Sequence, residues 1–289
     1  MENPACPLCG LQLNGAGGIV RALPPERAAS YARFIAEYER IRAAEGRSSA
    51  TDAYYCDLPY RDITDRHSRQ WRIRARSYDC LLRRVLQPQI PGGGRILDLG
   101  AGNCWMSHRL ALAGYSPVAV DLLTNAEDGL GAATHYRNSL PALFPRFQAE
   151  LARLPFADAQ FDAVIFNASF HYAEDAEATL SEALRCARPR GLVIISDTPW
   201  YRREESGRQM VAERQAIFCQ SYGTASDALH SMEYLTDLRL RTLAERSGID
   251  WAFRVPRYGL RWRLRPLVAR LRARREPSHF RIWVARKPA

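Results

Sequence analysis

Short apolar runs alternate with amphipathic stretches from residue 95 onward. The runs are rich in Val, Ile and Leu and predict strands, whereas the stretches between them carry apolar residues at helical spacing. Because the runs are apolar on both faces, we expect a parallel sheet covered by helices. The predicted strands are 95–100, 117–122, 146–151, 161–167, 191–197, 249–256 and 279–287, and the predicted helices are 103–113, 174–187 and 236–247.

The pattern changes before residue 90, where apolar residues at helical spacing predict helices in 26–46 and 67–86. We therefore expect an N-terminal helical extension at residues 1–90. A sheet domain follows at 91–289, and the glycines of "PGGG" mark the hinge between them. Within that domain, insertions are expected at 200–234 and 257–278, converging with the N-terminal helices over the carboxyl ends of the strands.

A glycine-containing loop joins the first predicted strand to the helix after it. Gly100 and Gly102 allow the backbone to approach a ligand there. A dinucleotide-binding turn would need a third glycine three residues on, but Trp105 occupies that position, and no Gly-Lys-Ser/Thr loop is present. These features favour a nucleoside-like ligand without phosphates. Asp121, at the end of the next strand, can accept both ribose hydroxyls, and Glu150 ends the third strand where an adenine amino group needs an acceptor.

At this point the sequence resembles a known family. The segments "RILDLGAGN" (95–103), "VAVDL" (118–122) and "LPFADAQFDAVIFNASF" (154–170) are similar to the class I S-adenosylmethionine-dependent methyltransferases. The resemblance is closest to the branch that methylates quinones, sterols and other small molecules. It covers residues 90–200 well and 235–287 more loosely. It implies a Rossmann-like α/β fold, with a seven-stranded, mostly parallel sheet, an antiparallel last strand and helices on both faces.

The resemblance also implies a cofactor, S-adenosyl-L-methionine, and a set of residues that bind it. Asp98, Gly100 and Gly102 would hold its methionine end. The implied cofactor-binding residues are Asp98, Gly100, Ala101, Gly102, Asp121, Leu122, Glu150, Leu151 and Asn167.

The remaining members of the set follow the strand ends. By resemblance, Asp121 takes the ribose hydroxyls and Leu122 packs on the adenine. Glu150, with the backbone of Leu151, reads the adenine edge, although the family often has Asp at this position. Asn167 faces the methionine part near the sulfonium.

The candidate catalytic residue is His171, which follows the fourth strand on the cofactor side. A hydroxyl acceptor needs a base, and imidazole titrates near neutrality. The alternative is that His171 only opens the next helix or hydrogen-bonds the loop; Tyr172 and Asp197 are further candidates of the same kind. Because "NASF" (167–170) lacks the prolines of many nitrogen methyltransferases, it disfavours that chemistry. No acidic cluster for a catalytic metal is readable.

Positive charge is concentrated at one end of the chain. The whole chain has a formal charge of +10, and residues 254–289 contain eleven arginines, one lysine and one acidic residue. In 257–278 the apolar residues Leu267, Val268 and Leu271 share a helix face flanked by arginines. Three interpretations stay open: contact with an anionic membrane, a grip on RNA phosphates, or a surface helix whose apolar face packs on the domain.

Other features of the sequence indicate in which cell compartment the protein is expected. Seven scattered cysteines fit reduced thiols, and no apolar run spans a bilayer, which together predict a cytoplasmic protein. We expect it to be bacterial. Cys6 and Cys9 form half of a zinc knuckle similar to that of certain ribosomal-RNA methyltransferases, but no second ligand pair follows, so we predict no bound metal. Trp71, Arg72 and Arg76 either line the cofactor entrance or belong to core and solvated faces.

The sequence thus predicts an enzyme that transfers a methyl group from S-adenosylmethionine to a small or lipid-like acceptor. An RNA methyltransferase is the alternative within the enzyme class. A protein that binds S-adenosylmethionine as a scaffold, without turnover, is the alternative outside it.

Overall fold

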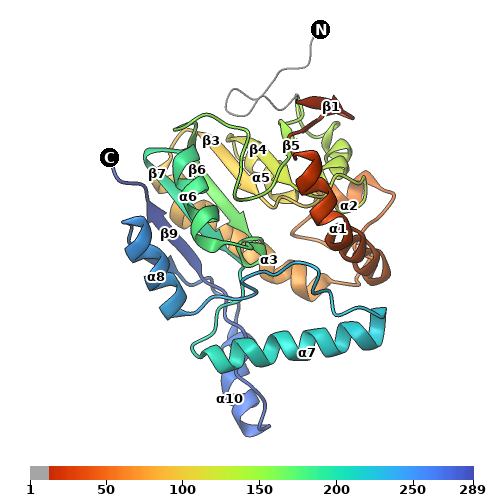
Figure 1. Ribbon diagram of the computed structural model, residues 1–289, viewed down its shortest axis with the longest axis vertical. Helices are drawn as coiled ribbons and strands as arrows, with labels where there is room; N and C mark the ends of the chain where they lie inside the picture. Colours follow the sequence, from red (N-terminus) through yellow and green to blue (C-terminus); the bar gives the residue numbers. More distant parts are fainter. Residues whose placement is uncertain (1–12) are drawn as a thin grey trace.

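A computed structural model of the chain describes residues 13–289 (Figure 1). These residues fold around one sheet with the strand order β1-β2-β5-β4-β3-β6-β7-β9-β8. The strands are β1 Asn14–Ala16, β2 Ile19–Arg21, β3 Arg95–Leu99, β4 Ser116–Asp121, β5 Arg146–Gln148, β6 Phe161–Asn167, β7 Ala187–Ser196, β8 Trp251–Arg254 and β9 Ile282–Arg286. The α-helices are α1 Pro25–Glu45, α2 Asp52–Asp57, α3 Ser68–Leu81, α4 Gln87–Gln89, α5 Trp105–Leu112, α6 Ala176–Cys186, α7 Glu204–Tyr222, α8 Asp237–Ser247, α9 Leu260–Arg263 and α10 Arg265–Leu271. A π-helical turn, η1 Leu82–Leu86, and two 3₁₀ helices, η2 Leu130–Tyr136 and η3 Phe170–Tyr172, complete the elements.

The middle of the sheet is parallel and buried on both faces. β3 pairs in parallel with β4 and β6, and the antiparallel strand β9 lies between β7 and β8. Side chains alternate across the sheet: Ile96 packs with α3 and α5, whereas Leu97 and Leu99 pack with α6 and α8. This confirms the predicted α/β fold, mostly parallel with helices on both faces.

The sheet has nine strands within residues 13–289 rather than the predicted seven. The additional pair, β1 and β2, forms an antiparallel hairpin, and β2 adds in parallel to β5. Arg146 ties the hairpin to the sheet, because its guanidinium donates to the carbonyls of Gly17 and Leu130 at 3.3 and 3.2 Å. Three-residue strands are too short to show an alternating pattern, which explains why the sequence predicts only helices in this region.

The third strand of the predicted set is shorter than expected. β5 ends at Gln148, whereas the sequence predicts a strand to residue 151. The chain turns directly after it, where the amide of Arg153 donates to the carbonyl of Glu150 at 3.3 Å. Glu150 and Leu151 therefore lie in a turn rather than at a strand end.

The segment before residue 90 shares a core with the sheet. Trp71 and Tyr78 of α3 pack edge-on against Trp105 of α5, with ring centroids 6.0 and 5.8 Å apart. At the other end of the chain, α7 and α10 lie at the lower end of Figure 1, and α10 projects from the body. Every helix in the described part of the chain is too short or too polar to cross a bilayer.

Candidate functional site

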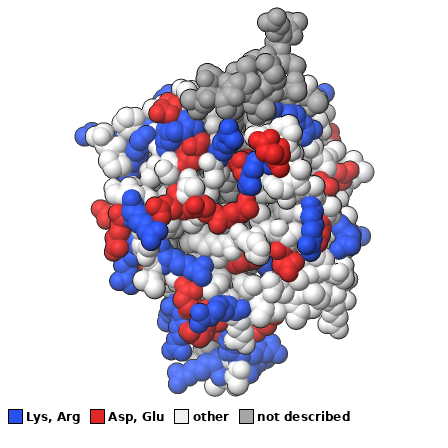
Figure 2. Space-filling view, viewed as in Figure 1, with Lys and Arg blue, Asp and Glu red and all other residues white. Residues whose placement is uncertain are grey.

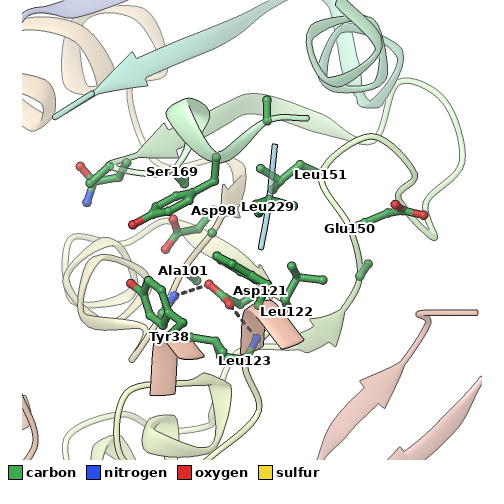
Figure 3. A pocket seen from close by; sticks show the side chains of 18 of the residues that line it. Tyr38, Asp98, Ala101, Asp121, Leu122, Leu123, Glu150, Leu151, Ser169 and Leu229 are labelled. Atoms are coloured by element: carbon green, nitrogen blue, oxygen red, sulfur yellow. Dashed lines mark hydrogen bonds between the residues drawn. The ribbon is translucent and has the colours of Figure 1, made fainter. Parts of the chain in front are cut away.

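A cavity of about 390 Å³ opens at the carboxyl ends of β3, β4 and β6; we call it the first cavity (Figure 3). Strand-end and loop residues form its floor, and α1 and α3 cover it. Its lining includes all nine residues that the sequence predicts for cofactor binding: Asp98, Gly100, Ala101, Gly102, Asp121, Leu122, Glu150, Leu151 and Asn167. Its volume lies within the range of small-molecule sites.

The turn from Gly100 to Gly102 forms the floor of the first cavity. The amides of Gly100 and Ala101 both donate to the carbonyl of Val120, at 2.8 and 3.0 Å, which holds the turn against β4. Gly100 has φ +73°, and a Cβ atom built there would lie 2.3 Å from the Cβ of Ser169. Only glycine therefore fits at position 100 without a shift of the neighbouring loop.

Asp121 lies beside this turn at the end of β4. Its carboxylate accepts from the amides of Gly102 and Leu123, each at 2.8 Å (dashed lines in Figure 3). Burial raises the pKa of Asp121 to about 6, against the effect of those hydrogen bonds. Each carboxylate oxygen keeps a lone pair that can accept from a ligand hydroxyl.

Asp98, on β3, is the second buried carboxyl group of the first cavity. Its Oδ2 accepts from the hydroxyl of Ser107 at 2.7 Å, but its Oδ1 has no hydrogen-bond partner among the described residues. Burial raises the pKa of Asp98 to about 7, and the nearby charge of Asp121 contributes to this increase. A buried acceptor without a partner is costly, so this atom favours a ligand that brings a donor.

Glu150 lines the first cavity, and one of its two carboxylate oxygens, Oε2, is paired with helix α1. Its carboxylate accepts from Arg27 at 2.8 Å and from the hydroxyl of Tyr31 at 3.2 Å, both on α1. Figure 3 shows the Glu150 side chain pointing away from Leu122 and Leu151. Because these contacts join residues more than a hundred positions apart, the sequence gives no sign of them.

Helix α1 supplies most of the cover. The sequence predicts that the N-terminal helices converge here, but it does not identify which α1 residues line the cavity. One face of α1 lines the first cavity with Arg27, Tyr31, Phe34, Tyr38 and Arg42. These residues recur at steps of three or four, which is one helix face, so the spacing marks them as a group. The same pattern describes an ordinary core-facing stripe, and the sequence alone does not distinguish the two.

Helix α3 contributes a different set of side chains from the one predicted. Trp71 is buried and lines the first cavity, but Arg72 and Arg76 are exposed. Arg74 is the arginine of α3 that lines the first cavity. Its guanidinium stacks over Trp71, 4.9 Å from the ring centroid. It has no ion-pair or hydrogen-bond partner among the described residues. Burial lowers the pKa of Arg74, and the charge of Arg42 adds to this effect.

A second cavity of about 280 Å³ adjoins the first. His171 lines this second cavity, not the first, together with Asp197, Arg214 and Glu233. Phe280 also lines it. Both cavities share seven lining residues: Phe34, Tyr38, Arg42, Arg74, Ala168, Tyr172 and Leu229.

His171 is held as a neutral imidazole. Burial lowers its pKa to about 3, and the positive charges of Arg214 and Arg74 act in the same direction. Its Nδ1 has no hydrogen-bond partner among the described residues. This pKa is far below the neutral titration expected from the sequence, so His171 is a weaker base than a free imidazole. Its unprotonated nitrogen can still accept a hydrogen bond or a proton from a group in the second cavity.

Two of the three segments predicted to converge at the site do so. Helices α1 and α3 line both cavities, and the insertion 200–234 contributes Arg214, Leu229 and Glu233. The third segment, 257–278, supplies no lining residue to either cavity and projects away from them. The Cys6/Cys9 knuckle lies outside the described residues.

Comparison with known proteins identifies the part of the chain that carries the first cavity. Residues 97–195 match the family model described as "Methyltransferase domain". Over these residues the chain carries a methyltransferase domain. S-adenosyl-L-methionine is the cofactor that the sequence resemblance implies for this domain.

Relatives of the methyltransferase domain act on different compounds. The chain is 37% identical over 112 residues to a demethylmenaquinone methyltransferase of Beutenbergia cavernae, covering 37% of this chain and 43% of that protein. It is 30% identical over 118 residues to a malonyl-[acyl-carrier protein] O-methyltransferase of Erwinia pyrifoliae, covering 39% of this chain and 41% of the relative. The matched region thus spans less than half the length of either relative.

A solved structure agrees with the fold of the methyltransferase domain. Phosphoethanolamine N-methyltransferase 2 of Haemonchus contortus, in complex with S-adenosyl-L-methionine, superposes with a TM-score of 0.50. The sequences are 18% identical, and the match covers 71% of this chain and 52% of the solved chain.

The first cavity fits S-adenosylmethionine on the evidence of its own residues. The unpartnered Oδ1 of Asp98 matches an ammonium group, and Arg74 matches a carboxylate, so the cavity offers both charges needed by an amino-acid end. At Gly100 the cradle has no room for a side chain beside Ser169. Trp105 also lines the first cavity from the start of α5, the position where a pyrophosphate-binding turn would have glycine.

Proposed function

We propose that the protein transfers the methyl group of S-adenosylmethionine, held in the first cavity, to a small or lipid-like acceptor in the second. The observation that carries this proposal is the adjacency of the two cavities, which share the aromatic side chains of Phe34, Tyr38 and Tyr172. Their ring centroids lie 5.7 to 6.1 Å apart. An acceptor in the second cavity would meet the cofactor at this aromatic border.

The floor residues hold the two ends of the cofactor in this proposal. Asp98 accepts from the methionyl ammonium and Arg74 donates to its carboxylate, while Asp121 accepts from the ribose hydroxyls. The turn at Gly100, Ala101 and Gly102 supports the backbone approach of the same ligand. These roles follow from the positions of unpartnered and half-satisfied groups in the first cavity.

The adenine end would lie against Leu122 and Leu151, which face each other across the first cavity in Figure 3. We assign adenine recognition to Glu150 with the backbone near Leu151, and Oε2 of Glu150 is also tethered to Arg27. Asn167 ends β6 on the methionine side. Packing of the adenine between the two leucines would exclude water from one end of the cavity.

The sulfonium supplies an already activated methyl group, so the protein mainly aligns the acceptor and excludes water. His171 is the residue we propose to take the acceptor proton, because its Nδ1 lacks a partner in the second cavity. The imidazole is neutral at neutral pH and has the lone pair that this step requires.

The acceptor class rests on the relatives and the lining. Demethylmenaquinone methyltransferases match at 37% identity over 112 residues in Beutenbergia cavernae. Aromatic side chains at the shared border, and Phe218 and Phe280 in the second cavity, suit a planar or chain-bearing organic acceptor. These observations favour a small or lipid-like molecule over a macromolecule.

The test follows a tritiated methyl group from S-adenosylmethionine into fractions of a cell extract. We expect label in the lipid or small-solute fraction with the wild-type protein. We also expect calorimetry to show that Asp121→Ala weakens S-adenosylmethionine binding at least about tenfold, the scale of lost charge-assisted hydrogen bonds. Unchanged affinity in that variant would overturn the cofactor site.

The fractions separate the alternatives. Label found only in RNA would replace the proposed acceptor by a nucleic acid. Cofactor binding without transfer into any fraction would indicate the scaffold alternative. For the proposed base, His171→Ala should lower the rate and leave cofactor affinity unchanged; a full rate in this variant would reject that role.

A further inference from the structure

Helices α9 and α10 form one nearly continuous rod that presents apolar side chains to solvent. Leu264 joins the two helices with right-handed helical backbone angles. Leu260, Leu267 and Leu271 are 69%, 55% and 78% exposed. The exposed apolar residues of this rod are Leu260, Leu264, Leu267, Val268 and Leu271, which we call the leucine stripe. Their spacing places them on one face of the rod.

The opposite face of the rod anchors it to the domain. Trp262 packs against Tyr258 and Phe280, with ring centroids 4.7 and 5.6 Å apart. The guanidinium of Arg265 stacks 3.7 Å from the centroid of Trp262, and Arg275, beyond the rod, binds Glu213 of α7 at 2.5 Å. Because aromatic residues hold the inner face, the leucine stripe is turned outward by the fold. The interpretation that the apolar face packs on the domain is therefore wrong.

Unpaired arginines flank the leucine stripe. No acidic residue occurs between Asp250 and Glu276 in the sequence. In residues 257–274, six exposed arginines have no carboxylate partner among the described residues: Arg257, Arg261, Arg263, Arg270, Arg272 and Arg274. Figure 2 shows Lys and Arg side chains gathered over the lower projection, where α10 lies in Figure 1.

We propose that the leucine stripe and its six arginines dock the protein on the surface of an anionic lipid bilayer. The leucines enter the boundary between headgroups and acyl chains, and the arginines meet lipid phosphates. This surface complements such a bilayer in both apolarity and charge. RNA would match only the arginines and would leave the leucine stripe exposed to water. The proposal does not depend on methyl transfer, because it uses no residue that lines either cavity.

The test is co-sedimentation of the full chain with vesicles of phosphatidylglycerol and phosphatidylcholine, compared with phosphatidylcholine alone. We expect binding to the anionic vesicles that weakens as salt rises. Leu267→Ser with Leu271→Ser should weaken binding at least about tenfold, because two apolar side chains no longer enter the bilayer. Arg270→Gln, Arg272→Gln and Arg274→Gln together should weaken it about a hundredfold.

Matched controls come from leucines exposed elsewhere. Leu112 and Leu238 are 52% and 63% exposed, and their change to Ser should leave vesicle binding unaltered. Melting curves establish that each variant is folded. The proposal is overturned if wild-type protein does not bind anionic vesicles, or if the Leu267/Leu271 variant binds like wild type. It is also overturned if the Leu267/Leu271 variant differs from wild type only in self-association measured without vesicles. Complete displacement of the vesicles by an RNA hairpin would overturn it as well.

Discussion

The two cavities lie side by side but are built in different ways. The first is formed largely by backbone turns and strand ends between residues 98 and 175, with helices α1 and α3 added as a cover. The second takes its walls from α1, α3, α7 and the residues around His171 and Phe280, which are distant in the sequence. A ligand held by a local backbone turn leaves a short motif, whereas one held by side chains from distant helices does not.

The cavities also differ in charge. Buried carboxyl groups dominate the floor of the first cavity, where burial raises the pKa values of Asp98 and Asp121. In the second cavity, burial keeps the His171 imidazole neutral, and the charges of Arg214 and Arg74 act in the same direction. Arg74 lies at the border and belongs to both. The contrast predicts that substitutions on the floor act through cofactor binding and fold, whereas those around His171 act through the acceptor.

The largest loss of stability is expected at Gly100, where the first cavity has no room for a side chain. Gly100→Ala introduces a Cβ that would lie 2.3 Å from Ser169 at a backbone angle of φ +73°. Strain and overpacking should lower the free energy of unfolding by about 2–5 kcal/mol, measured by chemical denaturation. S-adenosylmethionine binding should fall with it.

Gly102→Ala is the matched control, because its Cβ would lie 3.6 Å from the nearest atom, the carbonyl oxygen of Asp128, at φ +52°. Only the backbone cost of about 1–2 kcal/mol remains there. Ser169→Gly should restore part of the stability of Gly100→Ala. Equal losses at the two glycines, without any rescue, would contradict the close contact.

The fold and the position of the first cavity could be predicted from the sequence for a physical reason. Buried parallel strands produce apolar runs, and Gly100 and Asp121 occupy positions that follow directly from strand ends. The β1–β2 hairpin could not be predicted from the sequence, because three-residue strands are too short to show an alternating pattern. Its place beside β5 depends on long-range contacts of Arg146.

The second cavity illustrates what the sequence does not contain. The position of His171 directly after the fourth strand marks it in the sequence, but its pKa depends on burial and on the charges of Arg214 and Arg74, which come from distant helices. In α3, the helical pattern identifies Trp71 as apolar and does not tell which arginine turns inward. The fold selects Arg74, because Arg72 lies on the exposed face.

A smaller effect is expected at Arg74, and it should show whether this side chain acts mainly in the first cavity or in the second. Arg74→Gln removes a half-buried cation that has no ion-pair partner among the described residues. We expect S-adenosylmethionine affinity to fall about 10- to 150-fold, the range for a hydrogen bond to a charged group. The unliganded protein should melt at the same or a higher temperature, because a half-buried charge without an ionic partner is costly. Arg72→Gln is the exposed control and should leave both unchanged. If Arg74→Gln raised only the KM for the acceptor, its cation would serve the second cavity alone.

The smallest effect is a pH dependence that belongs to the first cavity. Burial raises the pKa of Asp98 to about 7, and the proposed contact with the methionyl ammonium requires the carboxylate form. Protonation below this pKa therefore weakens binding, and affinity for S-adenosylmethionine should fall about tenfold from pH 8 to pH 6. Calorimetry at each pH measures this change. Asp98→Asn should bind more weakly at pH 8 and lose most of the slope, leaving the smaller contribution of Asp121, whose pKa is about 6. Equal slopes in the wild type and the variant would place the titrating group elsewhere, and the orphaned Oδ1 of Asp98 would then need a partner other than the cofactor.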